Sequence, residues 1–276
     1  MSEAAKRMQI GPPMSEGAGP EVVVIRDAAM LAQAVAGRLV SRLVDAQAAR
    51  GGASVVLTGG GIGTAVLAAL AASPAREAID WPHLEVWWGD ERFLPAASQD
   101  RNESAARRAL LDHVDVRPER VHPIAAADSC DSPEDAAAEY ASVLRVAAAP
   151  EGYGEPVPRF DLLMLGIGPE GHVASIFPEA PAAYDERTVT AVHGCPKPPP
   201  TRVTLTFPAL SAAREVWVLG SGAQKAQAVA LTLSGAGPVQ VPAAGVRGRS
   251  RTLLLLDEGA AGGLPRDLRR RASPGA

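Results

Sequence analysis

The 276-residue sequence predicts an α/β fold, with one domain built on a mostly parallel, Rossmann-like, doubly wound sheet that carries helices on both faces. Three observations predict this fold. Short, near-continuous apolar runs alternate with longer helical segments, a pattern typical of strands buried on both faces. Aromatic residues make up only 4% of the chain, so the core must be aliphatic. No long polar linker or fixed-period repeat divides the middle, so we expect a single domain over residues 21–263.

The elements follow from these runs in order. Strands are expected at 22–25, 54–57, 84–88, 160–165, 188–192, 202–206, 215–219 and 252–256. Asp27 can cap a helix that reaches about residue 49, and further helices are expected after the glycine-rich segment 58–63, near 101–113, at 133–148 and at 223–234. Residues 1–20 and 264–276 can bury little apolar surface, so we expect both to be loose tails.

Composition excludes several classes of protein. The chain carries 27 basic and 31 acidic residues, a formal net charge of −4, without a basic block, which argues against a nucleic-acid partner. No apolar run is long enough for a membrane span or a signal peptide, so we expect a cytoplasmic protein without a membrane partner. Cys130 and Cys195 are far apart in sequence and are expected to be free thiols, neither a disulfide nor a metal-ligand pair.

In a sheet of this kind ligands bind at the carboxyl ends of the strands, so the loops there are the candidate site. The first such loop is Thr58-Gly59-Gly60-Gly61-Ile62-Gly63-Thr64, whose backbone N–H groups could approach an anion at a helix start. It fits neither the dinucleotide-binding pattern, because Thr64 stands where Gly or Ala is needed, nor a P-loop, because it has no Lys. A simple tight turn is the competing interpretation.

The second loop, Gly89-Asp90-Glu91-Arg92, places two carboxylates and a guanidinium after the third strand. Arg92 could hold a phosphate with two hydrogen bonds. Asp90 and Glu91 could bind a metal, yet no histidine near them in sequence indicates a metal cluster. A salt-bridged turn is the alternative here.

The third loop, Gly166-Ile167-Gly168-Pro169-Glu170-Gly171-His172, directly follows a strongly apolar strand. An imidazole with a pKa near neutrality can take a proton from water, and the glycines leave room for a substrate. The sequence therefore favours a functional role for His172. For His83, His113, His122 and His193 the surroundings favour a structural or solvated role.

The fourth segment, Cys195-Pro196-Lys197-Pro198-Pro199-Pro200-Thr201-Arg202, combines two cations with a stiff backbone. Rigidly held cations indicate an anionic ligand, although a proline-rich connector with solvated charges would look the same. Cys195 has no acid–base neighbour in sequence and is interpreted as structural.

Taken in order, these segments resemble the 6-phosphogluconolactonase family, within a superfamily that includes the glucosamine-6-phosphate deaminases. The most specific parts are Gly-Asp-Glu-Arg at 89–92, Gly-His-Val-Ala-Ser-Ile-Phe-Pro at 171–178, and Pro-Lys-Pro-Pro with a following Arg at 196–202. The similarity runs from the glycine-rich loop to at least residues 245–248. It implies the α/β fold described above and a sugar-phosphate substrate.

The resemblance also implies a reaction, the hydrolysis of 6-phospho-D-glucono-1,5-lactone to 6-phospho-D-gluconate in the oxidative pentose phosphate pathway, without a metal or other cofactor. It implies that His172 is the general base and that Glu170 orients it or the lactone. The substrate- and phosphate-binding residues implied are Gly59, Gly60, Gly61, Asp90, Arg92, Asn102, Lys197 and Arg202. The chain departs from the family pattern twice, with Arg101 in place of a Ser and Glu170 in place of an Asp.

Two alternatives remain open. A glucosamine-6-phosphate isomerase or deaminase shares the glycine-rich loop and the Gly-His segment, but usually carries Asp-Glu-Tyr where this chain has Asp90-Glu91-Arg92. A non-catalytic sugar-phosphate sensor would need a DNA-binding module, and residues 1–20 are too short for one. We expect the protein to be a monomer or a weak homodimer.

Overall fold

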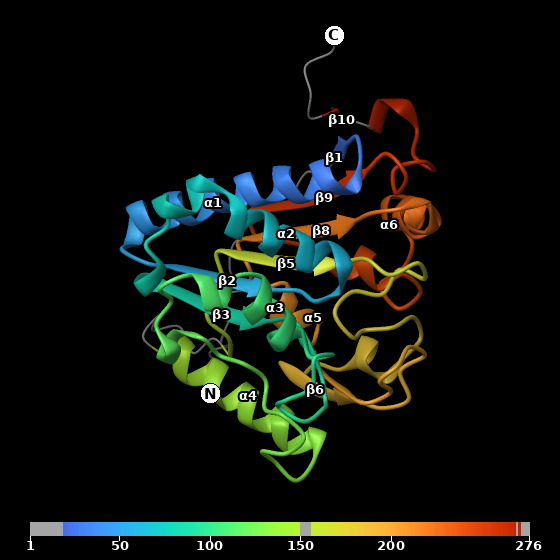
Figure 1. Ribbon diagram of the computed structural model, residues 1–276. Coiled ribbons are helices and arrows are strands. Elements are labelled where there is room, and N and C mark those ends of the chain that lie inside the picture. Colours follow the sequence, from blue (N-terminus) through green and yellow to red (C-terminus); the bar gives the residue numbers. More distant parts are fainter. Residues whose placement is uncertain (1–18, 150–155, 269, 272–276) are drawn as a thin grey trace, which may run out of the picture.

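The central sheet is parallel throughout in the computed structural model, which describes residues 19–149, 156–268 and 270–271. Within those residues seven strands pair in the order β10-β1-β9-β8-β5-β2-β3 (Figure 1). The strands are β1 (Glu21–Ile25), β2 (Ala53–Leu57), β3 (Leu84–Trp88), β5 (Leu162–Gly166), β8 (Glu215–Gly220), β9 (Arg251–Asp257) and β10 (Arg270–Arg271). The predicted fold class, a single-domain α/β protein on a mostly parallel sheet, is confirmed.

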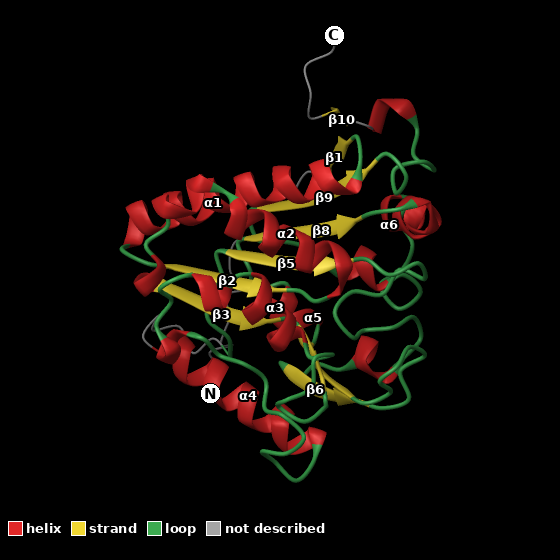
Figure 2. Cartoon of the chain, in the orientation of Figure 1, coloured by secondary structure: helices red, strands yellow, loops and turns green. Residues whose placement is uncertain are grey.

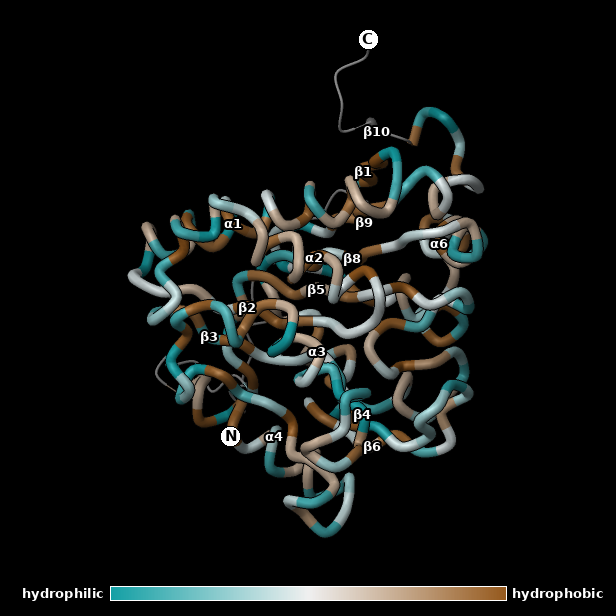
Figure 3. The backbone as a smooth tube through the Cα atoms, in the orientation of Figure 1, coloured by the Kyte–Doolittle hydropathy of each residue, from teal (hydrophilic) through white to brown (hydrophobic). Residues whose placement is uncertain are grey.

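The apolar runs that predicted these strands are buried. Leu162, Leu163, Met164 and Leu165 of β5 are at most 1% exposed, as expected for a strand covered on both faces. Figure 3 shows the same pattern as hydrophobic colouring along the strands of the sheet. The core is therefore mainly aliphatic, as the composition indicated.

The helices are α1 (Ala28–Arg50), α2 (Gly60–Ala72), α3 (Asn102–Ala109), α4 (Pro133–Ala148), α5 (Phe207–Leu210) and α6 (Ala226–Leu233). Short 3₁₀ turns lie at Pro74–Ala78, Trp81–His83, Leu111–His113, Pro118–Arg120, Pro181–Tyr184, Ala223–Lys225, Pro242–Gly245 and Arg266–Leu268. Asp27 caps α1 as predicted, because its carboxylate accepts a hydrogen bond of 2.8 Å from the backbone N–H of Met30. The helix ends at Gly51, whose φ of 76° is left-handed.

The direction of the chain across the sheet reverses between β2 and β5. From β1 the chain passes to β2 and then outward to β3, whereas β5, β8 and β9 follow each other in the opposite direction. Right-handed crossovers therefore put α1 and α2, which pack together, on one face and the α5 and α6 connections on the other. The carboxyl ends of β2 and β5 meet at this reversal, where Figure 2 shows the strand arrowheads pointing toward a cluster of loops. A ligand site is expected at such a position.

A second, antiparallel sheet corrects part of the prediction. The strands expected at 188–192 and 202–206 do not join the parallel sheet. They form β6 (Val189–Val192) and β7 (Arg202–Leu205), which pair with β4 (Asp90–Arg92), a segment predicted to be a loop. In Figure 1 this sheet lies beyond β3, beside α4, which packs on β6 and β7. The pairing brings the acidic 90–92 segment next to the start of β7, more than 100 residues later.

Helix α4 is attached to the edge of the main sheet by a buried tyrosine. The hydroxyl of Tyr140 donates to the carbonyl oxygen of Trp88 at 3.1 Å and accepts from the Trp88 N–H at 3.0 Å. Tyr140 also packs near Trp87, whose ring is in turn close to Phe160. Three aromatic side chains, Trp87, Tyr140 and Phe160, thus lie close together beside β3.

The two ends of the chain were expected to be loose. Residues 1–18, 269 and 272–276 lie outside the described residues, so the expectation for the first tail is not addressed. In the second predicted tail, residues 264–276, Leu264 is only 4% exposed and β10 pairs with β1. These parts of the predicted tail therefore belong to the folded domain. No helix in the part of the chain that the structure describes is long and apolar enough to cross a membrane.

Candidate active site

A pocket of about 780 Å³ lies at the carboxyl ends of β2 and β5. Its walls contain every residue predicted to bind substrate together with the predicted base, namely Gly59, Gly60, Gly61, Asp90, Arg92, Asn102, His172, Lys197 and Arg202. Glu170 does not line the pocket but contacts His172 and Lys197. The structure therefore brings together four segments that are far apart in sequence.

The glycine-rich loop forms the wall at the end of β2. A Cβ on Gly59 would lie 1.9 Å from Oδ1 of Asn102, so only glycine fits against that side chain. Gly60 has a φ of 81°, which also favours glycine. Helix α2 starts here without a side-chain cap, so N–H groups of its first turn stay available to an anion in the pocket.

His172 follows β5 and is held by its own loop. The N–H of Gly168 donates to the His172 carbonyl at 2.9 Å, and the ring packs on Phe177 with centroids 4.5 Å apart. A Cβ on Gly168 would lie 1.9 Å from Nδ1, so glycine is required to make room for the imidazole. Nδ1 is buried and lies 3.1 Å from Oε1 of Glu170, without a well-aligned hydrogen bond. This leaves Nε2 as the nitrogen that can reach a molecule in the pocket.

Burial and charge set the protonation of this group. Burial lowers the pKa of His172, Glu170 opposes that shift, and Lys197 reinforces it. Burial alone would raise the pKa of Glu170, but its own backbone N–H, Lys197 and His172 outweigh burial and lower the pKa. The ion pair between Lys197 Nζ and Glu170 Oε2 measures 2.9 Å. At neutral pH the site therefore holds a neutral imidazole beside an ionised carboxylate.

The proline-rich segment is fixed by Arg202, the first residue of β7. Its guanidinium donates to the carbonyl oxygens of Lys197, Pro198 and Pro199 at 3.0, 3.2 and 3.2 Å, and it lies 5.8 Å from the centre of the Phe177 ring. Arg202 is only 6% exposed. In this structure it holds the backbone that carries Lys197, while the predicted contact of Arg202 with substrate stays a prediction.

Asp90 and Asn102 form a buried polar pair beside the glycine-rich loop. Asn102 Nδ2 donates to the carbonyl oxygen of Asp90 at 2.9 Å and to its carboxylate at 3.3 Å. The hydroxyl of Ser175, three residues after His172, donates to the other carboxylate oxygen of Asp90 at 2.6 Å. These bonds connect the second predicted loop to the third.

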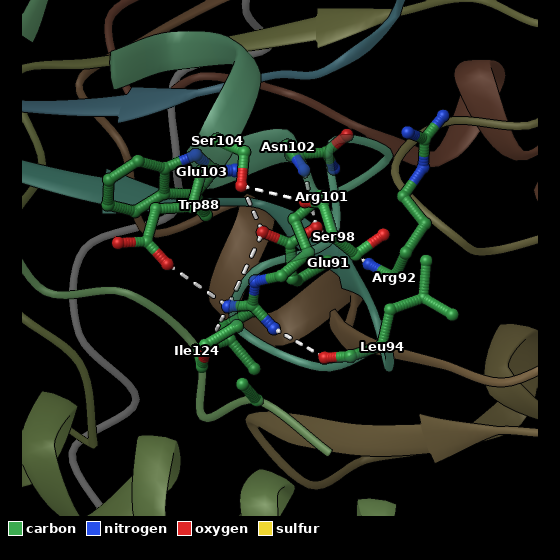
Figure 4. A network of polar contacts seen from close by, with 12 residues as sticks. Trp88, Glu91, Arg92, Leu94, Ser98, Arg101, Asn102, Glu103, Ser104 and Ile124 are labelled. Atoms are coloured by element: carbon green, nitrogen blue, oxygen red, sulfur yellow. Dashed lines mark hydrogen bonds and ion pairs between the residues drawn. The ribbon is translucent and has the colours of Figure 1, made fainter. Parts of the chain in front are cut away.

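Arg92 also lines the pocket, and its guanidinium donates to the carbonyl oxygen of Asp100. Figure 4 shows this side chain extended away from the neighbouring buried side chains of Glu91 and Arg101. Arg92 thus contributes a cationic side chain to the pocket wall.

Sequence reasoning missed three polar residues of the pocket, Ser221, Gln224 and Lys225, which follow the carboxyl end of β8. Burial, followed by the charge of Lys197, lowers the pKa of Lys225, so the two ammonium groups lie within electrostatic reach of each other. The carboxyl-end rule that selected the other loops would have found this one.

No group of three or more His, Cys, Asp or Glu side chains is arranged to hold a metal ion within residues 19–149, 156–268 and 270–271. Cys130 and Cys195 are both free thiols, as predicted. The expectation of a metal-free site stays a prediction.

Comparison with known proteins agrees with the resemblance seen in the motifs. Residues 26–255 match the family described as glucosamine-6-phosphate isomerases/6-phosphogluconolactonase. A 6-phosphogluconolactonase of Streptomyces coelicolor is 58% identical over 252 residues, covering 90% of this chain and 96% of that protein. One from Mycobacterium tuberculosis is 49% identical over 247 residues, covering 88% and 98%.

Solved structures have the same fold. A 6-phosphogluconolactonase from Trypanosoma brucei superposes with a TM-score of 0.75 at 28% identity, covering 89% of this chain and 99% of that one. A monomeric glucosamine-6-phosphate deaminase shares the fold alone, with a TM-score of 0.72 at 18% identity over 88% of this chain and all of that one. The chain therefore belongs to the glucosamine-6-phosphate isomerase/6-phosphogluconolactonase family.

Proposed function

We propose that this protein hydrolyses 6-phospho-D-glucono-1,5-lactone to 6-phospho-D-gluconate, with His172 as the general base. The observation that carries the proposal is the position of His172, a partly buried imidazole with a lowered pKa that lines a pocket rich in cations. The relatives from Streptomyces coelicolor and Mycobacterium tuberculosis bear the name of this activity, which supports the choice of substrate.

In the proposed reaction, neutral His172 takes a proton from water through Nε2, and the resulting hydroxide attacks C1 of the lactone. Backbone N–H groups of the Gly59–Gly61 loop hold the oxyanion that forms. The imidazolium then returns its proton to the departing ring oxygen, which opens the ring. The enzyme forms no covalent intermediate and uses no metal in this scheme.

Glu170 acts on His172 in this scheme. Its carboxylate, 3.1 Å from Nδ1, stabilises the imidazolium that exists only after the proton has moved. Lys197 keeps Glu170 ionised through the 2.9 Å ion pair. Glu170 thus favours the charged form of the base at the moment when catalysis requires it, while the charge of Lys197 acts in the opposite direction.

The substrate phosphate is proposed to bind Arg92 and Lys197. The Lys197 ammonium has three donors and gives one to Glu170, so the others remain for a phosphate. Lys225 adds a further cation to the same pocket. Holding the phosphate at a fixed distance from the base orients C1 toward the activated water.

The test compares freshly prepared 6-phosphoglucono-δ-lactone with unphosphorylated glucono-δ-lactone, in the presence of EDTA and with the spontaneous rate subtracted. We expect rapid hydrolysis of the phosphorylated lactone that survives EDTA, and a much higher KM for the other. Loss of activity in EDTA would refute the metal-free mechanism. No acceleration over the spontaneous rate would refute the lactonase assignment, and glucosamine 6-phosphate would then be the substrate to assay.

A further inference from the structure

A buried pair of charges lies directly behind the pocket wall formed by β4 and α3. The side chains of Glu91 and Arg101 are each 1% exposed, and their charged groups come within 3.7 Å. Neither lines the pocket, but their neighbours Asp90, Arg92 and Asn102 do. Figure 4 shows the Glu91 and Arg101 side chains close together, with the Arg92 side chain pointing away from them.

The Glu91 carboxylate connects two elements through backbone N–H groups. Oε1 accepts from the N–H of Arg92 at 2.8 Å and of Asn102 at 2.6 Å, and Oε2 accepts from the N–H of Glu103 at 2.8 Å. Residue 101, at the N-cap of α3, makes no capping bond with its own side chain. Glu91 therefore takes the place of the cap and satisfies the first N–H groups of α3 from a different strand.

Arg101 compensates the buried charge and fixes it in place. Its guanidinium donates to the carbonyl oxygens of Ile124 at 2.7 Å and Leu94 at 3.3 Å and to Glu103 Oε2 at 3.2 Å. Burial raises the pKa of Glu91, and Arg101 is the strongest influence in the opposite direction. Arg101 thus favours the ionised form of Glu91, which accepts three hydrogen bonds.

Asn102 and Arg92, whose backbone N–H groups bond to the Glu91 carboxylate, have little freedom to move. The side chain of Asn102 is bonded to Asp90 and lies so close to Gly59 that no Cβ would fit between them. A shift in the Asn102 backbone would therefore disturb the glycine-rich loop as well as β4. Arg92 depends on the same Oε1 for the position of its backbone.

We propose that Glu91 and Arg101 are positioning residues, a buried ion pair that sets the places of Arg92 and Asn102 in the pocket and thereby determines affinity for the phosphorylated substrate. The inference rests on the proposed function in taking Arg92 as a phosphate ligand. It assigns a role to Arg101, one of the two positions where the chain departs from the family pattern.

The test separates positioning from stability with the variants Glu91→Gln, Arg101→Met and their combination. Each single change removes one partner of the buried pair, so both should lower Tm, whereas the combination removes both charges and should recover much of that loss. We expect KM to rise about tenfold in Glu91→Gln, the effect of weakening one charge-assisted hydrogen bond, with kcat changed less than about threefold. In the combination KM should stay high although Tm recovers. Recovery of KM together with Tm would mean that the pair only stabilises the fold, and would overturn the proposal.

A second set of variants tests whether Glu91 changes KM through Arg92 and Asn102. In an Arg92→Ala/Asn102→Ala background, adding Glu91→Gln should change KM less than about twofold, because its targets are already absent. An undiminished tenfold effect there would contradict the proposal. Arg107→Met is the matched control. Arg107 lies on α3 and donates a hydrogen bond to Glu103, but it is exposed and lies outside the pocket. The KM of the Arg107→Met variant should therefore equal that of the wild type.

Titration with inorganic phosphate supplies a readout independent of turnover. The Kd for phosphate should rise in the Glu91→Gln/Arg101→Met variant. If the wild type binds phosphate but does not hydrolyse the lactone, the proposed function fails, and the positioning role is still tested by this Kd. An unchanged Kd in that variant would overturn the positioning role. Absence of phosphate binding in the wild type would overturn the positioning role, because Arg92 would then hold no phosphate, while the lactonase assignment is decided by turnover of the lactone.

Discussion

Replacing Glu170 with Gln tests the electrostatics of the proposed base. The change preserves the shape of the side chain but removes the negative charge 3.1 Å from Nδ1 of His172. Burial already lowers the pKa of His172, and Glu170 opposes that shift, so the pKa should fall further in the variant. The acid limb of the kcat/KM profile, where activity is lost as the base becomes protonated, should therefore move to lower pH.

The cost in rate can be worked from the geometry. Two unit charges 3.1 Å apart interact by about 1 kcal/mol in water and by about 5 kcal/mol at an effective dielectric constant of about 20. The lower end applies here, because Glu170 is 31% exposed and Lys197 offsets its charge. A loss of about 1–2 kcal/mol in stabilising the imidazolium corresponds to a fall in kcat of about 5- to 30-fold.

The assay is a pH–rate profile of lactone hydrolysis for the wild type, Glu170→Gln and the control Glu186→Gln, which changes an exposed carboxylate outside the pocket. The spontaneous rate must be subtracted at each pH. The control should match the wild type. An acid limb that stays in place or moves to higher pH in Glu170→Gln, or an unchanged kcat, would refute the role of Glu170 in stabilising the imidazolium.

Three further changes probe other parts of the structure. Lys197→Ala should mainly raise KM, by about 10- to 100-fold for the loss of one charged contact; an unchanged KM in steady-state assays would remove it from the phosphate site. Gly59→Ala forces a Cβ to within 1.9 Å of Asn102 Oδ1, so it should lower the free energy of unfolding by about 1–3 kcal/mol in urea titrations and raise KM. A wild-type free energy of unfolding together with a wild-type KM would contradict the tight packing. Tyr140→Phe leaves the buried Trp88 N–H and C=O without their partner and should cost about 1–3 kcal/mol with normal kinetics, so altered KM would show that the effect of α4 reaches the pocket.

The main sheet and the place of the site could be predicted because their signals are local. Apolar runs mark the strands whatever their partners, and the carboxyl-end rule then selects the loops after β2 and β5 without knowledge of the strand order. His172 stands out because a titratable group in a glycine-rich loop after a buried strand has few structural reasons to be there. The same rule applied to the strand at 215–219 would have added Lys225.

The small sheet could not be predicted in the same way. β4 consists of Asp90, Glu91 and Arg92, residues that have no apolar pattern and form a strand only because β7 supplies a partner more than 100 residues later. The sequence does not predict the burial of Arg101 either, since arginine is seldom fully buried and its counter-charge, Glu91, lies on another element. Properties that depend on pairing between distant segments thus require the structure.

The exchange of His172 for Ala tests the proposed chemistry most directly. In hydrolysis of fresh 6-phosphoglucono-δ-lactone with EDTA present, kcat should fall by about 10²–10⁴, the range for loss of a general base. The control His193→Ala changes an exposed histidine paired with Glu134 and should retain wild-type turnover. Near-wild-type kcat in a folded His172→Ala protein would contradict the assignment of His172 as the base.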